Sequence, residues 1–472
     1  MSEIIIGAKV EKKLDLRNSD NKLFRIFANA MRNELLNKVL RKLGIDQLSM
    51  MQQEAEEHIL RGRHDVVILS PTGSGKTLAY LLPLIQLLDA SSSEVQALVV
   101  LPSRELAMQS DAVLKSMGSG LRSQSCYGGR ATMDEHRVLK QNRPQLVFGT
   151  PGRLNDHLDK GNIDAHHIKY IIIDEFDKCL EMGFQNEMSK LIDSLPSLER
   201  RILLSATDAE QIPQFVEMRR TDRLDYLVED EPVNDRVQVY QVDSPEKDKL
   251  GTLARLLLSL GESQSIVFLN YRDSVVRTDE YLRQQGFVTS AFHGGLEQRQ
   301  REDALYKFSN GSATVLVSTD LASRGLDIPQ IDNIIHYHLP LNEEALVHRV
   351  GRTARWDASG KTFFLIGPEE HLPEFVEAGV ESYEVEVTNE KPSAPRMTTL
   401  YIGKGKKDKI SKGDIVGFLC KKGGLQTSEI GRIDVAERYA YVAVKREKLQ
   451  QVIRMTRGEK IKGVRTILEP VR

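Results

Sequence analysis

One glycine-rich segment has the residues of a phosphate-binding loop. It reads Ser70-Pro-Thr-Gly-Ser-Gly-Lys-Thr77, follows the apolar run Val66–Ser70 and precedes a helical pattern over Leu78–Leu88. Such a loop turns backbone N–H groups toward phosphate oxygens, and the helix N-terminus adds partial positive charge. A glycine-rich connecting turn is the alternative, but strand, Lys-Thr pair and helix together favour a nucleotide site. The residues expected to bind it are Thr72, Gly73, Ser74, Gly75, Lys76 and Thr77.

Two roles in this loop follow from side-chain chemistry. We expect the Lys76 ammonium to reach the β- and γ-phosphates, and the Thr77 hydroxyl to bind Mg²⁺. The first glycine of the usual motif is replaced by Ser70, so the pattern is imperfect. Pro83 lies inside the helical pattern and is expected to kink it.

An acidic tetrapeptide, Asp174-Glu175-Phe176-Asp177, ends the strand pattern Tyr170–Asp174. Acidic residues at the carboxyl end of a strand in an open α/β sheet lie where ligands bind. We expect Asp174 to hold Mg²⁺ and Glu175 to orient or deprotonate an attacking water. On its own the tetrapeptide is also consistent with a solvated turn. Together with the upstream loop, it indicates a nucleoside triphosphatase.

A third cluster, His348-Arg-Val-Gly-Arg-Thr-Ala-Arg355, lies far along the chain. Arg352 and Arg355 are three residues apart, so both can face one phosphate group from a single helical turn. A solvated helix face is the alternative. If these arginines and Lys76 contact one nucleotide, the nucleotide joins two parts of the chain. Binding would then favour a closed state that hydrolysis releases.

The elements that must position these residues form two series of short β-branched runs. Near-continuous apolar strands that alternate with helical patterns indicate parallel sheets buried on both faces. The first series is Val66–Ser70, Ala97–Leu101, Gln145–Gly149, Tyr170–Asp174 and Arg201–Ser205. The second is Val237–Val242, Ser265–Leu269, Val288–Phe292, Thr314–Ser318, Asn333–His338 and Lys361–Ile366. Polar, proline-containing breaks at 229–235 and 391–396 predict linkers, so we expect two α/β domains and a small third one.

The amino-acid composition indicates which classes of protein the chain can belong to. The chain has 472 residues, 28% of them charged, with no apolar run long enough for a membrane helix. The start, Met1–Asp20, lacks the pattern of a signal peptide, and three scattered cysteines argue against a disulfide framework. These features predict a cytoplasmic protein without a membrane partner.

The charge is unevenly distributed. Residues 398–472 hold 18 Lys and Arg against 8 Asp and Glu, although the whole chain has a net charge of −2. A basic segment on an acidic body predicts an anionic partner, because a plain charged tail would lack the apolar periodicity found here.

The basic segment also has its own pattern, β-α-β-β-α-β, which is the order of an RNA-recognition motif. The elements are expected at Thr399–Gly403, Lys412–Lys421, Ile430–Val435, Ala440–Val444, Lys448–Thr456 and Val464–Leu468. The segments Leu400–Ile402 and Tyr439–Val442 resemble the two RNA-contacting strands of that motif, and the resemblance implies that Tyr401, Tyr439 and Tyr441 can stack on unpaired bases. The alternative is that they are structural sheet residues, since strands favour tyrosine. Lys404, Lys406 and Lys407 are expected to contact phosphates.

Taken in order, these motifs resemble those of the DEAD-box ATP-dependent RNA helicases over about residues 20–390. The resemblance implies two tandem RecA-like parallel-sheet domains, 20–228 and 236–390, followed by a small α+β domain at 398–472 resembling an RNA-recognition motif. It also implies ATP and Mg²⁺ as cofactors, RNA as substrate, and unwinding of short duplexes by gripping one strand's backbone.

The resemblance assigns roles to further positions of this sequence. Phe27, 25 positions before Gln52, matches the aromatic partner of an adenine-reading glutamine. Asp327 is expected to face the nucleotide. The positions implied for RNA contact are Arg104, Gly129, Thr150, Arg153, Thr319 and Arg324, and those implied for coupling hydrolysis to strand separation are Ser205, Thr207 and His348.

Two departures from the family pattern affect the rate of ATP hydrolysis that we expect. Phe176 replaces alanine in the acidic box, and Ala354 replaces a glycine between the two arginines. A phenylalanine needs room against the Ser205–Thr207 segment, so coupling could be altered. This keeps open a second hypothesis, an ATP-dependent RNA clamp or scaffold that rarely turns over. A third is a DNA translocase of the same superfamily.

The last 75 residues resemble the C-terminal domain of the bacterial DbpA-like subfamily, on the segments Ser411–Gly417, Ile430–Asp434, Tyr441–Val444 and Lys460–Gly463. The resemblance implies a tether to a hairpin of large-subunit (23S-type) ribosomal RNA, within a pre-ribosomal particle during large-subunit assembly. A single basic domain is enough to hold the protein on RNA, so a dimer is not required and we expect a monomer.

Overall fold

The computed structural model describes residues 34–71, 73–129, 132–207, 212–227, 237–320, 331–350, 360–376, 379–385 and 391–471. The chain divides into two compact units after Leu227. The first unit holds one parallel sheet, and the second holds a parallel sheet and two smaller antiparallel ones, of four and two strands.

The first unit is built on a seven-stranded sheet in the order β3-β4-β2-β5-β6-β1-β7, with every pairing parallel. The central strands β1, β2, β4 and β6 are buried along their whole length, as their β-branched sequences predict. The strands are β1 (Asp65–Leu69), β2 (Ala97–Val100), β3 (Ser123–Cys126), β4 (Leu146–Gly149), β5 (Tyr170–Ile173), β6 (Arg200–Ser205) and β7 (Thr221–Asp225).

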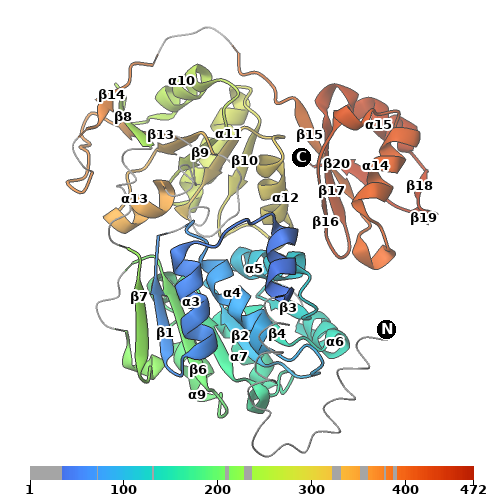
Figure 1. Ribbon diagram of the computed structural model, residues 1–472. Helices are drawn as coiled ribbons and strands as arrows, with labels where there is room; N and C mark the ends of the chain where they lie inside the picture. The colour runs from blue at the N-terminus through green and yellow to red at the C-terminus, as the bar shows by residue number, and fades with distance from the viewer. Residues whose placement is uncertain are drawn as a thin grey trace, which may run out of the picture. The chain divides into compact units, whose positions relative to one another are not determined.

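Helices pack on both faces of this sheet and enclose two hydrophobic cores (Figure 1). They are α3 (Met50–Arg61), α4 (Lys76–Leu87), α5 (Arg104–Met117), α6 (Thr132–Asn142), α7 (Pro151–Asp159), α8 (Phe176–Glu181) and α9 (Gln185–Asp193). Helix α4 continues through Pro83. All five strands predicted for this region are confirmed to within a residue or two. Strands β3 and β7 were not predicted, because their sequences, SQSC and TDRLD, are polar and lack an apolar run.

The second unit contains a parallel sheet in the order β10-β11-β9-β12-β13-β8-β14. Its strands are β8 (Val237–Asp243), β9 (Ser265–Phe268), β10 (Thr289–Phe292), β11 (Val315–Ser318), β12 (Asn333–His336), β13 (Gly360–Ile366) and β14 (Glu381–Ser382). Its helices are α10 (Leu250–Leu260), α11 (Arg272–Gln284), α12 (Gln298–Ser309) and α13 (Glu343–Val350). The six predicted strands are confirmed, and both sheets have the parallel α/β architecture expected from the sequence.

The C-terminal domain, residues 397–471 of the second unit, has an antiparallel sheet in the order β16-β17-β15-β20. Its elements are β15 (Met397–Ile402), α14 (Lys412–Lys421), β16 (Ile430–Val435), β17 (Ala440–Lys445), α15 (Leu449–Thr456), β18 (Lys460–Ile461), β19 (Val464–Arg465) and β20 (Leu468–Pro470). The predicted β-α-β-β-α-β order is confirmed up to α15.

The prediction for the last strand was wrong. Val464–Leu468 is not one strand, because Val464 and Arg465 pair with Lys460 and Ile461 in a short hairpin. The strand that completes the sheet begins at Leu468 and pairs with β15. Gly463, with φ of +81°, forms part of the hairpin turn that diverts the chain.

Across the residues that the structure describes, every helix is too short or too polar to span a lipid bilayer.

Candidate nucleotide- and RNA-binding site

The predicted site residues of the first unit gather at one edge of its sheet. Because all strands are parallel, the segments after β1, β2, β4, β5 and β6 leave the sheet at the same edge, where α/β proteins bind ligands. Strand β6 lies between β1 and β5, so the glycine-rich loop and the acidic box flank one strand.

The glycine-rich loop adopts a backbone that requires glycine. Gly73 and Gly75 have φ of +90° and +88°. A side chain at Gly75 would also collide with Gln52, since a Cβ there would lie 2.4 Å from Gln52 Nε2. The Gln52 amide donates to the Gly75 carbonyl oxygen at 3.3 Å. The sequence predicted both residues for nucleotide binding, and the structure brings them into contact.

Gln52 is held in place by the start of its own helix. The Ser49 hydroxyl accepts from the Gln52 backbone N–H, and the Gln52 Oε1 accepts from the Ser49 N–H at 3.1 Å. This capping box fixes the N-terminus of α3. The amide oxygen is therefore engaged with Ser49, while the amide nitrogen points toward the glycine-rich loop.

Lys76 is buried, with 8% of its surface exposed. Its ammonium donates to the carbonyl oxygens of Ser70 and Pro71, the latter at 3.1 Å, so the loop curls around the charge. Burial raises the pKa of Asp174, and the positive charge of Lys76 opposes that shift. The Lys76 ammonium and the Asp174 carboxylate are thus both buried at the end of the sheet, and their opposite charges attract each other.

Glu175 has a strained backbone. Its φ is +51° at the N-cap of α8, a conformation that costs a non-glycine residue about 1–3 kcal/mol. The side chain is buried, and the Glu175 N–H donates to Asp174 Oδ1 at 2.9 Å. Backbone strain of this kind is typical of a functional position when it occurs in a buried acidic residue near a ligand-binding edge.

Ser205 and Thr207 contact both the acidic box and the glycine-rich loop. The Ser70 N–H donates to the Ser205 carbonyl oxygen at 3.0 Å, and the Ser205 hydroxyl donates to the Thr207 carbonyl oxygen at 2.7 Å. The Thr207 hydroxyl donates to Asp177 at 3.3 Å. The segment after β6 therefore contacts both of its neighbours at the sheet edge.

The Phe176 side chain packs inside a hydrophobic core of the first unit. Only 2% of it is exposed, and it borders a cavity of about 10 Å³ that Ser205 and Ile212 also line. The phenylalanine that replaces the family's alanine is thus accommodated by apolar packing.

Two further loops at this edge carry predicted RNA contacts. The Arg104 guanidinium lies against Gly128 and Gly129, and a Cβ at Gly129 would stand 2.4 Å from Arg104 Nη1. Gly129 also has φ of +90°. Thr150 begins α7 without using its hydroxyl as a helix cap. Glycine at 129 therefore allows Arg104 to lie across the turn that follows β3.

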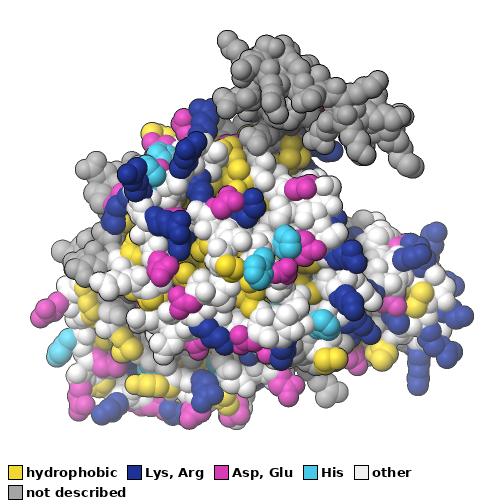
Figure 2. All heavy atoms as spheres, turned by 90° about the horizontal axis from the view of Figure 1, so that it is seen from below, with side chains coloured by type: hydrophobic (Ala, Val, Ile, Leu, Met, Phe, Trp, Pro, Cys, Tyr) yellow, Lys and Arg dark blue, Asp and Glu magenta, His cyan; other side chains and the backbone are white. Residues whose placement is uncertain are grey.

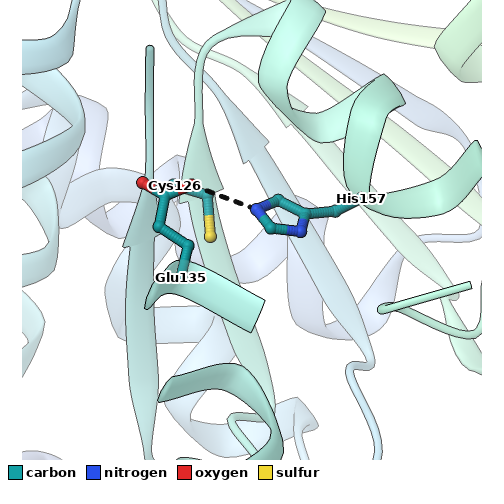
Figure 3. Close-up of side chains that lie close together, drawn as sticks. All are labelled: Cys126, Glu135 and His157. Carbon is teal, nitrogen blue, oxygen red and sulfur yellow. Dashed lines mark hydrogen bonds and ion pairs between the residues drawn. The ribbon is translucent and has the colours of Figure 1, made fainter. Parts of the chain in front are cut away.

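Arg153 depends on a buried network that the sequence did not reveal. Figure 3 shows Cys126, Glu135 and His157 converging from three elements. His157 Nε2 lies 3.1 Å from Glu135 Oε2, and Arg153 Nη1 lies 3.5 Å from the same oxygen. The Tyr127 N–H donates to Glu135 Oε1 at 3.2 Å. Sequence reasoning missed Glu135 and His157 because they lie 22 positions apart in different helices.

The same three side chains have metal-ligand chemistry, with ligand atoms within 4.8 Å of one another. However, Asn162 Nδ2 lies 3.0 Å from His157 Nδ1, and both Glu135 oxygens already accept hydrogen bonds or pair with Arg153. Glu135 and His157 are thus engaged by protein groups, and their contacts join α7 to α6 and to the turn that precedes α6.

Comparison with known proteins agrees with this geometry. The DEAD/DEAH box helicase family matches residues 49–215, the helicase conserved C-terminal domain matches 248–357, and the DbpA RNA binding domain matches 399–470. The ATP-dependent RNA helicase DbpA of Escherichia coli is 34% identical over 434 residues, which are 90% of this chain and 94% of that protein. This chain belongs to the DEAD-box ATP-dependent RNA helicases.

Other relatives agree with this assignment. The Bacillus subtilis ATP-dependent RNA helicase DbpA is 29% identical over 93% of this chain and 97% of its own length. Mss116p, solved bound to single-stranded RNA and AMP-PNP, has a TM-score of 0.66 at 25% identity, over 74% of this chain and 77% of that one. Members of this family are RNA-dependent ATPases, so the chain is an RNA helicase with an RNA-binding domain at its C-terminus.

In the second unit of this helicase, a fully buried arginine organises the segment that carries His348. Arg349 donates to Asp320 at 3.1 Å, to Asn270 at 2.8 Å and to the His338 carbonyl oxygen at 2.9 Å. Its guanidinium also stacks on Phe268. It anchors α13 to the ends of β9, β11 and β12, and His348 is buried beside it. Thr319, predicted to contact RNA, is half-buried just before Asp320.

The predicted RNA residues of the C-terminal domain fall into two groups. Lys406 and Lys407 are exposed, whereas Lys404 pairs with Asp408 at 3.0 Å. Figure 2 shows Lys and Arg side chains gathered on this domain. Tyr401, Tyr439 and Tyr441 are neighbours, with ring centroids 5.4–5.8 Å apart. Their outer side lies against α12 of the same unit.

Several predicted positions fall outside the described residues: Phe27, Thr72, Arg324, Asp327, Arg352 and Arg355.

Proposed function

We propose that this RNA helicase binds and hydrolyses Mg·ATP at the edge formed by the segments after β1 and β5. The supporting observation is the set of groups found there: a glycine-rich loop with left-handed backbone at Gly73 and Gly75, a buried ammonium and a buried carboxylate. That set fits a magnesium-bound triphosphate, which is anionic and carries a hard cation. When bound, the magnesium ion would supply charge neutralisation at the phosphates.

Each residue has a proposed part in this reaction. Thr72, Gly73, Ser74 and Gly75 hold phosphate oxygens through backbone N–H groups, and Lys76 neutralises them. Thr77 and Asp174 would hold the cation, and Glu175 orients the attacking water. Gln52 reads the adenine edge beside Phe27. The groups proposed to complete the nucleotide contacts from the second unit are Asp327, Arg352 and Arg355.

RNA is proposed to bind by its sugar–phosphate backbone. Arg104 and Arg153 are cationic, Gly129 allows close approach, and Thr150 offers a hydroxyl that does not cap α7. Thr319 and Arg324 would continue this contact in the second unit. Ser205, Thr207 and His348 are proposed to couple hydrolysis to strand separation. Since separation costs about 1.4 kcal/mol per base-pair step, only short duplexes open in one cycle.

We further propose that the C-terminal domain tethers the helicase to a large-subunit (23S-type) ribosomal RNA hairpin. The protein would act as a cytoplasmic monomer on pre-ribosomal particles during large-subunit assembly. The single observation that carries this proposal is the match of the DbpA RNA binding domain to residues 399–470. The net charge of +10 over 398–472 and the exposed Lys406 and Lys407 support it. A tether raises the local concentration of nearby duplexes without changing the motor itself.

The experiment is an ATPase assay with two ribosomal RNA fragments that differ only in the hairpin. The fragment that contains the hairpin should stimulate turnover at a concentration about tenfold lower. The double variant Lys406→Glu/Lys407→Glu should lose this preference. A matched control is Lys247→Glu/Lys361→Glu, since both lysines are exposed and lie outside the C-terminal domain. Equal stimulation by both fragments would contradict the tether and leave the RNA-dependent ATPase standing.

A further inference from the structure

A buried cluster in the first unit has the side chains of a metal site. Cys126 ends β3, Glu135 lies in α6 and His157 lies in α7. Figure 3 shows the three side chains directed toward one another, and one ligand atom from each lies within 4.8 Å of the other two. At most 4% of any of the three residues is exposed. A thiol, a carboxylate and an imidazole thus meet where water has little access.

The chemistry of this ligand set selects among metal ions. Zinc binds thiolate sulfur, imidazole nitrogen and carboxylate oxygen, with four ligands arranged as a tetrahedron. Calcium and magnesium prefer oxygen ligands, so the sulfur of Cys126 argues against them. With three protein ligands, a water molecule would take the fourth position, as it does in zinc sites that keep one position open.

The spacing of the ligand atoms is close to that of a tetrahedral site. His157 Nε2 lies 3.1 Å from Glu135 Oε2. Metal–ligand bonds of about 2.0–2.3 Å place tetrahedral ligand atoms roughly 3.3–3.7 Å apart, so closing the cluster around one ion needs shifts of about 1 Å. Small rotations of the three side chains can supply shifts of this size while their helices and strand stay in place.

Two of the ligands already have the outer partners that metal sites need. The Tyr127 N–H donates to Glu135 Oε1 at 3.2 Å, so that Oε2 is the oxygen directed at His157. The Asn162 amide lies 3.0 Å from His157 Nδ1, so that Nε2 is the nitrogen directed at Glu135. In metal sites, the second nitrogen of a ligating histidine and the second oxygen of a carboxylate are held in this way, which fixes their orientation.

Binding of a zinc ion replaces protons in this cluster. The Asn162 amide nitrogen donates to His157 Nδ1, which assigns the imidazole proton to Nε2. When the zinc–nitrogen bond forms, this proton passes to Nδ1, where the Asn162 amide oxygen accepts it after the amide turns over. The Cys126 thiol proton leaves to solvent as the zinc–sulfur bond forms. One proton is released per ion, and the thiolate and the carboxylate together balance the charge of the zinc.

We propose that Cys126, Glu135 and His157 form a binding site for one zinc ion. Arg153 Nη1 lies 3.5 Å from the Glu135 oxygen that binds the ion, so zinc and this arginine compete for one oxygen. Occupancy therefore releases Arg153 from Glu135. Arg153 belongs to the segment after β4 that is proposed to contact RNA, so the ion acts on that segment. The metal site itself does not depend on whether Arg153 binds RNA.

The first measurement uses cobalt as the probe, because Co²⁺ enters zinc sites and absorbs light. Titration of the full-length chain should produce a thiolate-to-cobalt charge-transfer band that saturates at one ion per chain. One equivalent of Zn²⁺ should remove the band, since zinc accepts tetrahedral geometry without any preference for another. Cobalt at the proposed magnesium position gives no such band, because the ligands there are oxygen atoms.

Variants then test which side chains bind the metal. Cys126→Ser should abolish the charge-transfer band, whereas Cys179→Ser, which changes another buried cysteine of the same unit, is the matched control and should keep it. Glu135→Gln preserves the size of the side chain and should weaken cobalt binding at least about tenfold. Circular dichroism verifies that each variant is folded.

Two results would overturn the site. One is a parent chain that gives no thiolate band, or gives it only at about millimolar cobalt, which would mean adventitious binding. The other is a Cys126→Ser variant that keeps the band.

The second measurement tests the competition with Arg153. Arg153→Gln should strengthen cobalt binding about tenfold, because it removes the cation that pairs with the ligating oxygen. Arg137→Gln removes the same charge from an exposed position of α6 and should leave the affinity within about twofold of the parent. Equal cobalt affinity in Arg153→Gln and Arg137→Gln would show that the ion and Arg153 do not compete.

Discussion

The Thr207 hydroxyl donates a hydrogen bond to Asp177 Oδ2 across 3.3 Å, which joins the segment after β6 to the acidic box after β5. A side chain proposed to couple hydrolysis to strand separation is therefore bonded to Asp177, two positions after Glu175, which is proposed to orient the attacking water.

Removing this hydroxyl should separate ATP hydrolysis from unwinding. We expect Thr207→Ala to lower duplex unwinding about tenfold while ATP turnover changes by less than about threefold, since one hydrogen bond to a charged group contributes about 1.5–3 kcal/mol. Thr207→Ser keeps the hydroxyl and is the control. Unwinding and turnover measured on the same preparation would check this, and an equal loss of both would argue against a coupling role.

Phe176 should contribute to stability and be dispensable for turnover. Phe176→Ala removes a buried ring beside an existing cavity, so the free energy of unfolding should fall by about 3–5 kcal/mol in urea denaturation. RNA-stimulated ATPase should persist at a temperature where the variant is folded. Phe176→Leu, which keeps most of the volume, should lose less stability. Abolished turnover in a folded Phe176→Ala protein would show that this position is not tolerant.

A side chain at position 129 should lower the affinity for RNA by more than its backbone strain alone would. Gly129→Ala and Gly120→Ala both place a side chain at φ near +90°, which costs about 1–3 kcal/mol. Only the first pushes a Cβ to 2.4 Å from Arg104, whereas Gly120 has nothing within 4 Å. We expect the RNA concentration for half-maximal ATPase to rise about tenfold in Gly129→Ala alone. A similar rise in Gly120→Ala would mean that strain, and not Arg104, is responsible.

The stability of the second unit should fall in mild acid. Burial, and then the charge of Arg349, hold the pKa of His336 well below its ordinary value. The unfolded chain takes up this proton as pH falls through about 6.5, while the folded protein does not. The unfolded state therefore binds more protons below that pH, and the free energy of unfolding decreases there, by up to about 1.4 kcal/mol per pH unit.

Urea denaturation between about pH 5 and pH 8 measures this slope. The comparison is with His336→Gln, which cannot take up the proton and should show a shallower slope below pH 6.5. Parallel pH profiles for the two proteins would contradict the assignment to His336.

The sequence by itself determined the two parallel sheets, the order of the C-terminal elements and the chemistry of the glycine-rich loop and acidic box. These follow from local signals: continuous β-branched runs, glycine spacing and charged residues at strand ends. Polar strands such as β3 and β7 gave no such signal, because their place in the sheet depends on partners distant in sequence.

Tertiary structure alone decided which partners the buried charges have and which surfaces stay open. Glu135 and His157 meet only because β3, α6 and α7 converge, and Arg349 reaches Asp320 only because β11 and α13 are neighbours. Tyr401, Tyr439 and Tyr441 illustrate the difference most directly. All three have the residue type for stacking on bases, but Tyr441 is covered by a helix that lies more than 130 positions earlier in the chain. Residue type and spacing reveal what a side chain can do, whereas packing determines what it is free to contact.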